Sequence, residues 1–194
     1  MALPNVNILL QNGQLGGLVQ FAEGVCGIIG TGSAVSGKIG VGDPRQVFNL
    51  QDAIDLGITL SDNPKMYRQV KEFYDEAGRN SELYIMLVPN TMSQTDMMDA
   101  TNANGAVKLL NYAQGRIRML GSCFVPPSGY TLNTSHGLDE DVFTAITKAQ
   151  ALAEGYAANH TPLRVLIEGR AFTGTAADLT DLHTLSHNRV AVTV

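Results

Sequence analysis

A glycine-rich stretch near the start of the chain carries the residue types of a nucleotide-binding loop. Gly32, Gly37 and Lys38 have the spacing of the phosphate-binding loop, in which backbone amides and a lysine hold nucleotide phosphates. That motif continues with a serine or threonine for Mg²⁺, and this chain has Ile39 there. A helix should also begin at once, whereas residues 38–44 alternate apolar residues with glycine and end in proline. We therefore expect a strand and a turn here, with a nucleotide-binding α/β enzyme as an alternative.

The other residues with chemical potential give weaker signals. His183 and His187 are four apart and would share one helix face, but the sequence offers no third metal ligand, so we interpret them as solvent-facing. Cys26 and Cys123 lie in apolar, strand-like runs, which predicts buried thiols. Residues 168–170, Glu-Gly-Arg, follow a strand and are interpreted as a salt-bridge or turn feature. We expect no catalytic residue, no metal and no cofactor, and we do not expect an enzyme.

Composition narrows the class of protein. A chain of 194 residues is long enough for one compact domain with a sizeable core. The net charge of −5 and the dispersed lysines and arginines argue against nucleic-acid binding, which needs clustered cations. No basic segment precedes an apolar N-terminal run, and no apolar run approaches the ~20 residues that span a bilayer. We expect synthesis in the cytoplasm and no membrane insertion.

Hydrophobic periodicity divides the chain into an arm and a domain. Residues 1–23 are polar and glycine-dotted apart from a strand-like piece at 6–10, so we expect an N-terminal arm, followed by an α/β domain over 24–194. Strands are expected at residues 25–30, 38–41, 46–50, 83–88, 117–125, 163–168 and 189–194. Helices are expected at residues 52–56, 64–77, 95–112 with a break at 102–105, 139–158 and 179–185. This alternation predicts a three-layer α/β sandwich, with a mostly parallel sheet and helices on both faces.

Several local signals are sharper. For the helix over 64–77, Asn63 is the expected N-cap, and Gly78 is expected to end it in the left-handed conformation. Residues 83–88 have almost no polar interruption, which predicts a strand covered on both faces. The last six residues form an apolar strand without a following turn, so we expect the natural chain to continue beyond Val194.

The order of these pieces resembles a known family. An apolar strand GVCGIIGTG is followed by KIGVGDPRQVFNLQDAIDLG and by NPKMYRQVKEFYDEAGRNSELYIMLVP. The later pieces are RMLGSCFVPP, VFTAITKAQALAEGYAANHTPLRVLIEG and NRVAVTV. Over residues 20–194 the series is similar to the N-terminal portion of contractile phage tail sheath proteins, in their divergent sheath-like prophage branch.

The resemblance implies a structural subunit that assembles with copies of itself around a tail tube, contacts baseplate components and becomes part of a virion or phage-tail-like particle. Physically, a strand with unpaired backbone groups can add to the sheet edge of a neighbour. The residues expected at inter-subunit contacts are Val6, Ile8, Leu10, Val190, Val192 and Val194. A further alternative is a monomeric flavodoxin-like module that binds a small ligand in a deep pocket at the strand ends.

Overall fold

A computed structural model describes residues 24–78, 80–172, 174, 177 and 179–193. The predicted arm with Val6, Ile8 and Leu10, and Val194 at the other end, lie outside the described residues. The strands are β1 (Cys26–Thr31), β2 (Arg45–Val47), β3 (Leu83–Val88), β4 (Met119–Cys123), β5 (Thr134–Ser135), β6 (Leu138–Asp139), β7 (Arg164–Glu168) and β8 (Val190–Thr193). The helices are α1 (Leu50–Asp55), α2 (Pro64–Ala77), α3 (Gln94–Met98), α4 (Ala106–Tyr112), α5 (Glu140–Ala158) and the 3₁₀ helix η2 (Leu182–Leu185).

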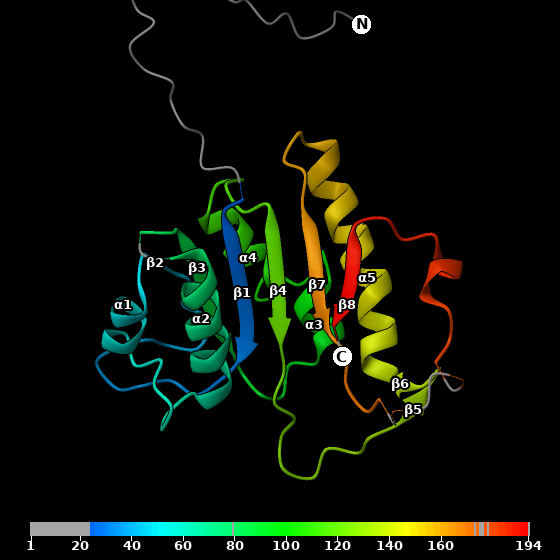
Figure 1. Cartoon of the computed structure of the whole chain (residues 1–194), viewed down its shortest axis with the longest axis horizontal. Helices are drawn as coiled ribbons and strands as arrows, with labels where there is room; N and C mark the ends of the chain where they lie inside the picture. The colour runs from blue at the N-terminus through cyan, green and yellow to red at the C-terminus, as the bar shows by residue number, and fades with distance from the viewer. Residues whose placement is uncertain (1–23, 79, 173, 175–176, 178, 194) are drawn as a thin grey trace, which may run out of the picture.

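The larger sheet has six strands in the order β2-β3-β1-β4-β7-β8. All neighbours run parallel except β2, which is antiparallel to β3 (Figure 1). The α/β fold with a mostly parallel sheet is therefore as predicted. Its five parallel strands follow the flavodoxin-like order, with the switch of direction between β1 and β4. Strands β5 and β6 form a separate hairpin.

Helices cover both faces of the sheet, but unequally. On one face, α3, α4 and α5 pack along the sheet and bury one core, which includes Leu109, Ala149 and Val165. On the other face, α1 and α2 bury a second core against β2, β3 and β1. In Figure 1, α2 lies in front of β3, whereas no helix lies in front of β4, β7 or β8. Among the residues that the structure describes, half of this face therefore has no third layer.

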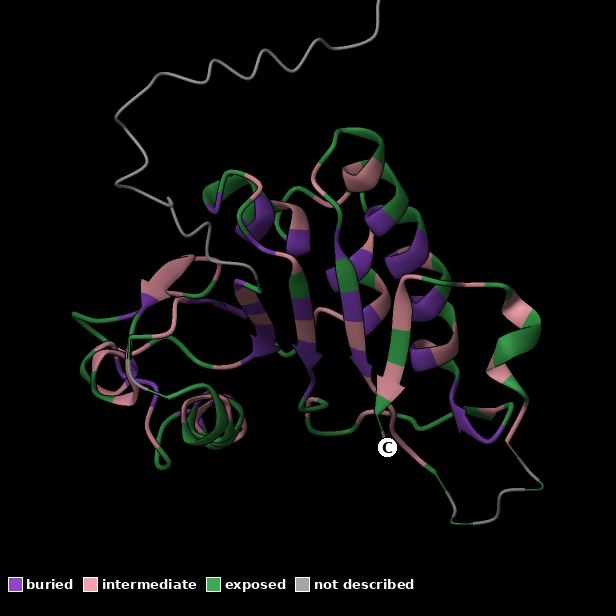
Figure 2. Cartoon of the chain, turned by 45° about the horizontal axis from the view of Figure 1, so that its top comes forward, coloured by how far each residue is buried: buried purple, intermediate pink, exposed green. Residues whose placement is uncertain are grey.

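We call this uncovered half the open face and define it by Met119, Gly121, Leu166, Ala191 and Thr193. Parallel register places these side chains in neighbouring rows of β4, β7 and β8. Met119 is 47% exposed, although it is a large apolar side chain inside a strand. Exposed positions also recur along these strands in Figure 2. The opposite sides of β4 and β7 are buried, and that of β8 is half-buried. Within the described ranges, the sheet is therefore three-layered on one half and two-layered on the other.

The locally encoded elements agree closely with expectation. Helix α2 begins at Pro64 and ends at Ala77 as predicted. Gly78 follows with a positive φ of 77°, but its ψ of −179° differs from the left-handed helical conformation that was expected. Strand β3 is buried at every position, as its uninterrupted apolar run predicted. The expected helix over 95–112 consists of α3 and α4, separated at the predicted break. Within the described ranges, no helix combines the length and the apolar character needed to cross a membrane.

Two local expectations are wrong. Asn63 does not cap α2 with its side chain. Its carboxamide is buried, accepts a hydrogen bond from the Ser33 amide at 2.8 Å and donates to the carbonyls of Ser33 and Gly57. Tying two loops together competes with capping, because one side chain cannot do both. The expected strand over 38–41 is reduced to a single bridge between Val41 and Leu87.

The close approach of β1 and β4 gives a testable prediction. A Cβ added at Gly30 would overlap the Cys123 Sγ, so Gly30→Ala should destabilise the fold by about 1–3 kcal/mol through overpacking. Cys123→Ala should recover part of this loss in the double variant. Gly121→Ala is the matched control, because its Cβ would meet only the Gly27 carbonyl oxygen at 3.9 Å. Urea unfolding measures all four proteins, and equal losses for the two glycine variants would contradict the packing argument.

Candidate docking edge at strand β8

Strand β8 is the last strand of the sheet and pairs with β7 alone. The Arg189 carbonyl accepts from the Val165 amide at 2.9 Å, and the Thr193 carbonyl accepts from the Gly169 amide at 2.6 Å. Backbone groups alternate in direction along a strand, so those of Val190 and Val192 face away from β7. In the part of the chain that the structure describes, no backbone hydrogen bond occupies them on that side. Both valines were predicted contact residues, and within the described ranges the outward N–H and C=O of each have no backbone partner.

The opposite edge of the sheet is protected, which makes β8 distinctive. Strand β2 has only three residues, Arg45–Val47. Arg45 forms an ion pair with Asp43, and the Gln46 side chain donates to Glu82 at 2.6 Å. Short length and polar side chains are the devices by which proteins prevent edge pairing. Strand β8, with the sequence Val-Ala-Val-Thr, has neither a charge nor a proline.

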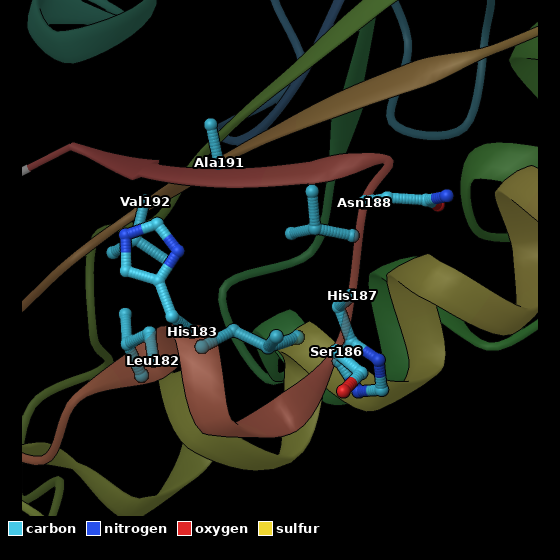
Figure 3. Close-up of a pocket in the computed structure, with 9 residues that line it drawn as sticks. Leu182, His183, Ser186, His187, Asn188, Ala191 and Val192 are labelled. Atoms are coloured by element: carbon cyan, nitrogen blue, oxygen red, sulfur yellow. The ribbon is translucent and has the colours of Figure 1, made fainter.

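A groove of about 510 Å³ lies beside this edge. Val190 and Val192 of β8 line it. In Figure 3, Val192 points toward η2, and Ala191 points to the other side of the strand. Ile146 of α5 lines the groove as well. The wall opposite β8 consists of Leu182, His183, Ser186, His187 and Asn188. The edge therefore combines free backbone groups with an apolar recess for alternate side chains, which is the arrangement that strand addition uses.

The two histidines belong to this wall. The helix predicted over 179–185 is the shorter 3₁₀ helix η2, and Ser186 ends it with φ 55°. His183 and His187 therefore do not lie on successive turns of an α-helix. His183 is exposed and His187 is half-buried, so the interpretation as solvent-facing holds for the first. Among the described residues, no group of three potential ligands gathers around either one.

Four backbone amides of the glycine-rich loop donate to acceptors within the protein. The loop amides that donate to protein acceptors, at 2.8–3.0 Å, are those of Gly32, Ser33, Val35 and Lys38. A phosphate cradle requires such amides to be free and to lead into a helix N-terminus. Here Ile39 is buried after the loop, and the next helix starts only at Leu50. The spacing of Gly32, Gly37 and Lys38 thus comes from a turn, in which Gly37 has φ 73°.

A small pocket does lie at the carboxyl ends of β1, β3 and β4, where doubly wound sheets bind ligands. Its volume is about 150 Å³, whereas ligand sites typically reach ~300–1,000 Å³. Lys65 at its rim forms an ion pair with Glu168, and the Glu168 carboxylate accepts from the Phe124 amide at 3.0 Å. These contacts hold the carboxyl ends of the strands together. The expectation of a salt bridge at residue 168 is confirmed.

Arg170 forms the second ion pair of the predicted segment. Its guanidinium contacts the Asp139 carboxylate at 2.6 Å and lies 4.2 Å from the centre of the Phe124 ring. Asp139 is 1% exposed and also accepts a hydrogen bond from the Tyr130 hydroxyl at 2.9 Å. No local sequence pattern indicates that Arg170 and Asp139 are partners, because they lie 31 residues apart in the chain. The cluster fixes the loop after β7 to the start of α5, which lines the groove.

Both cysteines are free thiols. Cys123 is buried as predicted, and desolvation raises its pKa to about 12. Cys26 is half-buried, and burial raises its pKa as well. Raised pKa values keep both sulfurs protonated at neutral pH, and the thiolate is the nucleophilic form. The two side chains therefore contribute to packing.

Comparison with known proteins gives a family assignment. No curated protein matches the chain. Residues 3–194 match the family described as DUF2586, N-terminal domain. That match covers nearly the whole chain, including the glycine-rich loop, the open face and the β8 edge. The chain therefore belongs to the DUF2586 N-terminal domain family.

Proposed function

We propose that the protein is a structural subunit of a contractile tail sheath, which assembles with copies of itself around a tail tube. The observation that carries the proposal is the unguarded edge of β8 beside an apolar groove. An edge strand of this kind is a template for pairing with another chain, and natural monomers usually block it. A protein that functions by binding further copies of itself requires such an edge to stay accessible.

The chain also carries a segment that suits this edge. Val6, Ile8 and Leu10 alternate with other residues, so that in an extended strand all three would face one side. Added alongside β8, such a strand would pair with the outward backbone groups of Val190 and Val192. Its three apolar side chains would then enter the groove. Main-chain pairing supplies affinity in this mode, and the pockets for alternate side chains supply specificity.

The glycine-rich loop supports a subunit that moves without a nucleotide. Four of its amides already have protein acceptors and the next helix starts only at Leu50, so the loop lacks the arrangement of a phosphate cradle. Contraction would then draw on a metastable packing of many subunits, released when their contacts rearrange. Strand-mediated links would persist during that rearrangement, because backbone pairing tolerates rotation of the attached domains better than side-chain packing does.

Electron microscopy combined with sedimentation tests the proposal. We expect the purified protein to form rings or tubes, and the triple variant Val6→Ser, Ile8→Ser, Leu10→Ser to stay monomeric. The matched control is Asn5→Ser, Asn7→Ser, Gln11→Ser, which changes the opposite side of the same strand and should assemble. A protein that is monomeric at every concentration, or assembly that both triple variants retain, would overturn the proposal.

A further inference from the structure

No element of the described ranges covers the open face, although its apolar side chains favour a covering layer. Parallel sheets normally have both faces buried, because crossover connections place helices on each side. Here hollows of about 160 Å³ and 230 Å³ lie on the uncovered side of β4, β7 and β8. The floor includes Met119, Gly121 and Leu166. A central region of the sheet, and not only its rim, therefore exposes apolar surface.

The chain contains an apolar segment of the right size. Residues 15–22 have the sequence LGGLVQFA and carry no charge. Leu15, Leu18, Val19 and Phe21 supply large apolar side chains within these eight residues. Burying each such side chain is worth roughly 1.5–3 kcal/mol. A segment of this composition gains by packing on apolar surface within its reach.

The segment joins the body at the rim of the open face. The Val25 carbonyl accepts hydrogen bonds from the Arg118 and Met119 amides, at 2.8 and 3.4 Å, so the chain enters β1 beside Met119. Eight extended residues reach up to about 26 Å. A five-residue strand such as β4 spans about 17 Å. Residues 15–22 can therefore cross the whole face without leaving their own chain.

Charges at the same rim are complementary. Arg164 lies beside Met119 in register at the start of β7, and Arg189 immediately precedes β8. Both arginines line the smaller hollow, and no ion pair among the described residues involves either. Glu23 is the only charged side chain in residues 1–23, and it lies two residues before Val25. The sequence therefore puts a carboxylate two residues away from a rim that carries two arginines.

We propose that residues 15–22 dock on the open face of their own chain, with Glu23 paired to the arginines at its rim. The apolar side chains cover Met119, Leu166 and Ala191 and complete the missing layer. Residues 6–10 then leave the body from a fixed point. The proposal goes beyond the sheath function, because it concerns a single molecule and holds whether or not copies assemble.

A tryptophan reporter tests the docking directly. The chain contains no tryptophan, so Phe21→Trp introduces a single fluorophore. Its emission should be blue-shifted relative to the unfolded protein and protected from acrylamide. Adding Met119→Glu should shift the emission to the red and raise the quenching constant several-fold. Met119 is 47% exposed, so this change should leave the far-ultraviolet circular dichroism unaltered. Ala191→Glu, also at an exposed position, should act in the same way.

The experiment has a control variant and two outcomes that would contradict the docking. Leu132→Glu places the same charge at a 53% exposed leucine in a loop outside the open face, and should leave the tryptophan emission unchanged. The measurement is made at a concentration where sedimentation shows a monomer. A solvent-exposed tryptophan there, or a buried one that ignores Met119→Glu and Ala191→Glu, would overturn the proposal. These readouts require no assembly, so they are separable from a failure of the sheath function.

Discussion

Replacing Arg170 with methionine should lower the free energy of unfolding by about 3–5 kcal/mol, because it leaves a buried carboxylate without its cation. The Asp139 carboxylate is 1% exposed and contacts the guanidinium at 2.6 Å. Methionine has a similar length, so the change removes the charge and its hydrogen bonds while retaining apolar volume. The guanidinium also stacks on the Phe124 ring, which adds to the loss. Urea or guanidinium unfolding monitored by circular dichroism measures the effect.

A second substitution separates the unpaired charge from lost packing. In the Arg170→Met background, Asp139→Asn removes the isolated negative charge and keeps an oxygen that can accept from the Asp141 amide. The double variant should therefore be more stable than Arg170→Met alone. If the double variant were less stable than the single variant by the full cost of Asp139→Asn in the native protein, the two residues would not be coupled. Such additivity would contradict the ion pair as the source of stability.

Val192→Pro should abolish assembly while leaving the monomer folded. The Val192 amide faces away from β7, so proline removes no hydrogen bond of the sheet. It does remove a donor that an incoming strand needs, and its ring lies on the outer edge. Proline on edge strands is one of the ways in which natural sheets prevent pairing. Sedimentation and electron microscopy should detect monomers in place of rings or tubes, with the circular dichroism of the unmodified protein.

Ala191→Pro is the matched control for that experiment. Ala191 lies between Arg189 and Thr193 in the alternation, so its backbone faces β7. Proline there should destabilise the fold by about 1–3 kcal/mol, because it leaves an acceptor of β7 without a partner. The two substitutions are one position apart. Val192→Pro should prevent assembly and leave the monomer folded, whereas Ala191→Pro should lower the stability of the fold. Assembly that survives Val192→Pro would show that the outer edge of β8 is not the contact.

Local sequence signals predicted much of the fold. Pro64 and Gly78 indicated the boundaries of helix α2. An uninterrupted apolar run indicated strand β3, because only a strand covered on both faces can bury such a run. Strand and helix alternation then gave the parallel sheet. The role of Asn63 was not predictable in this way, because its partners Ser33 and Gly57 belong to a loop that only the folded chain brings near.

The candidate site was predicted in part. The sequence, with its resemblance to a sheath, indicated the final strand as a contact, and the structure adds the direction in which Val190 and Val192 present their backbone groups. The groove beside them could not be foreseen, because η2 and Ile146 of α5 meet β8 only in three dimensions. The open face was equally hidden. The open face is exposed because α2 packs only on the neighbouring strands, and no local sequence pattern encodes how much of the sheet α2 covers.

The contrast between the blunt β2 edge and the accessible β8 edge gives the sheet a polarity. If the surface that donates a strand differs from the one that receives it, contacts between copies are heterologous, and each added copy renews the same acceptor. Such contacts close into a ring or continue as a helix, according to the rotation between successive copies. The assembly of copies would then grow in one direction. A factor other than this domain would have to limit the length of the assembly.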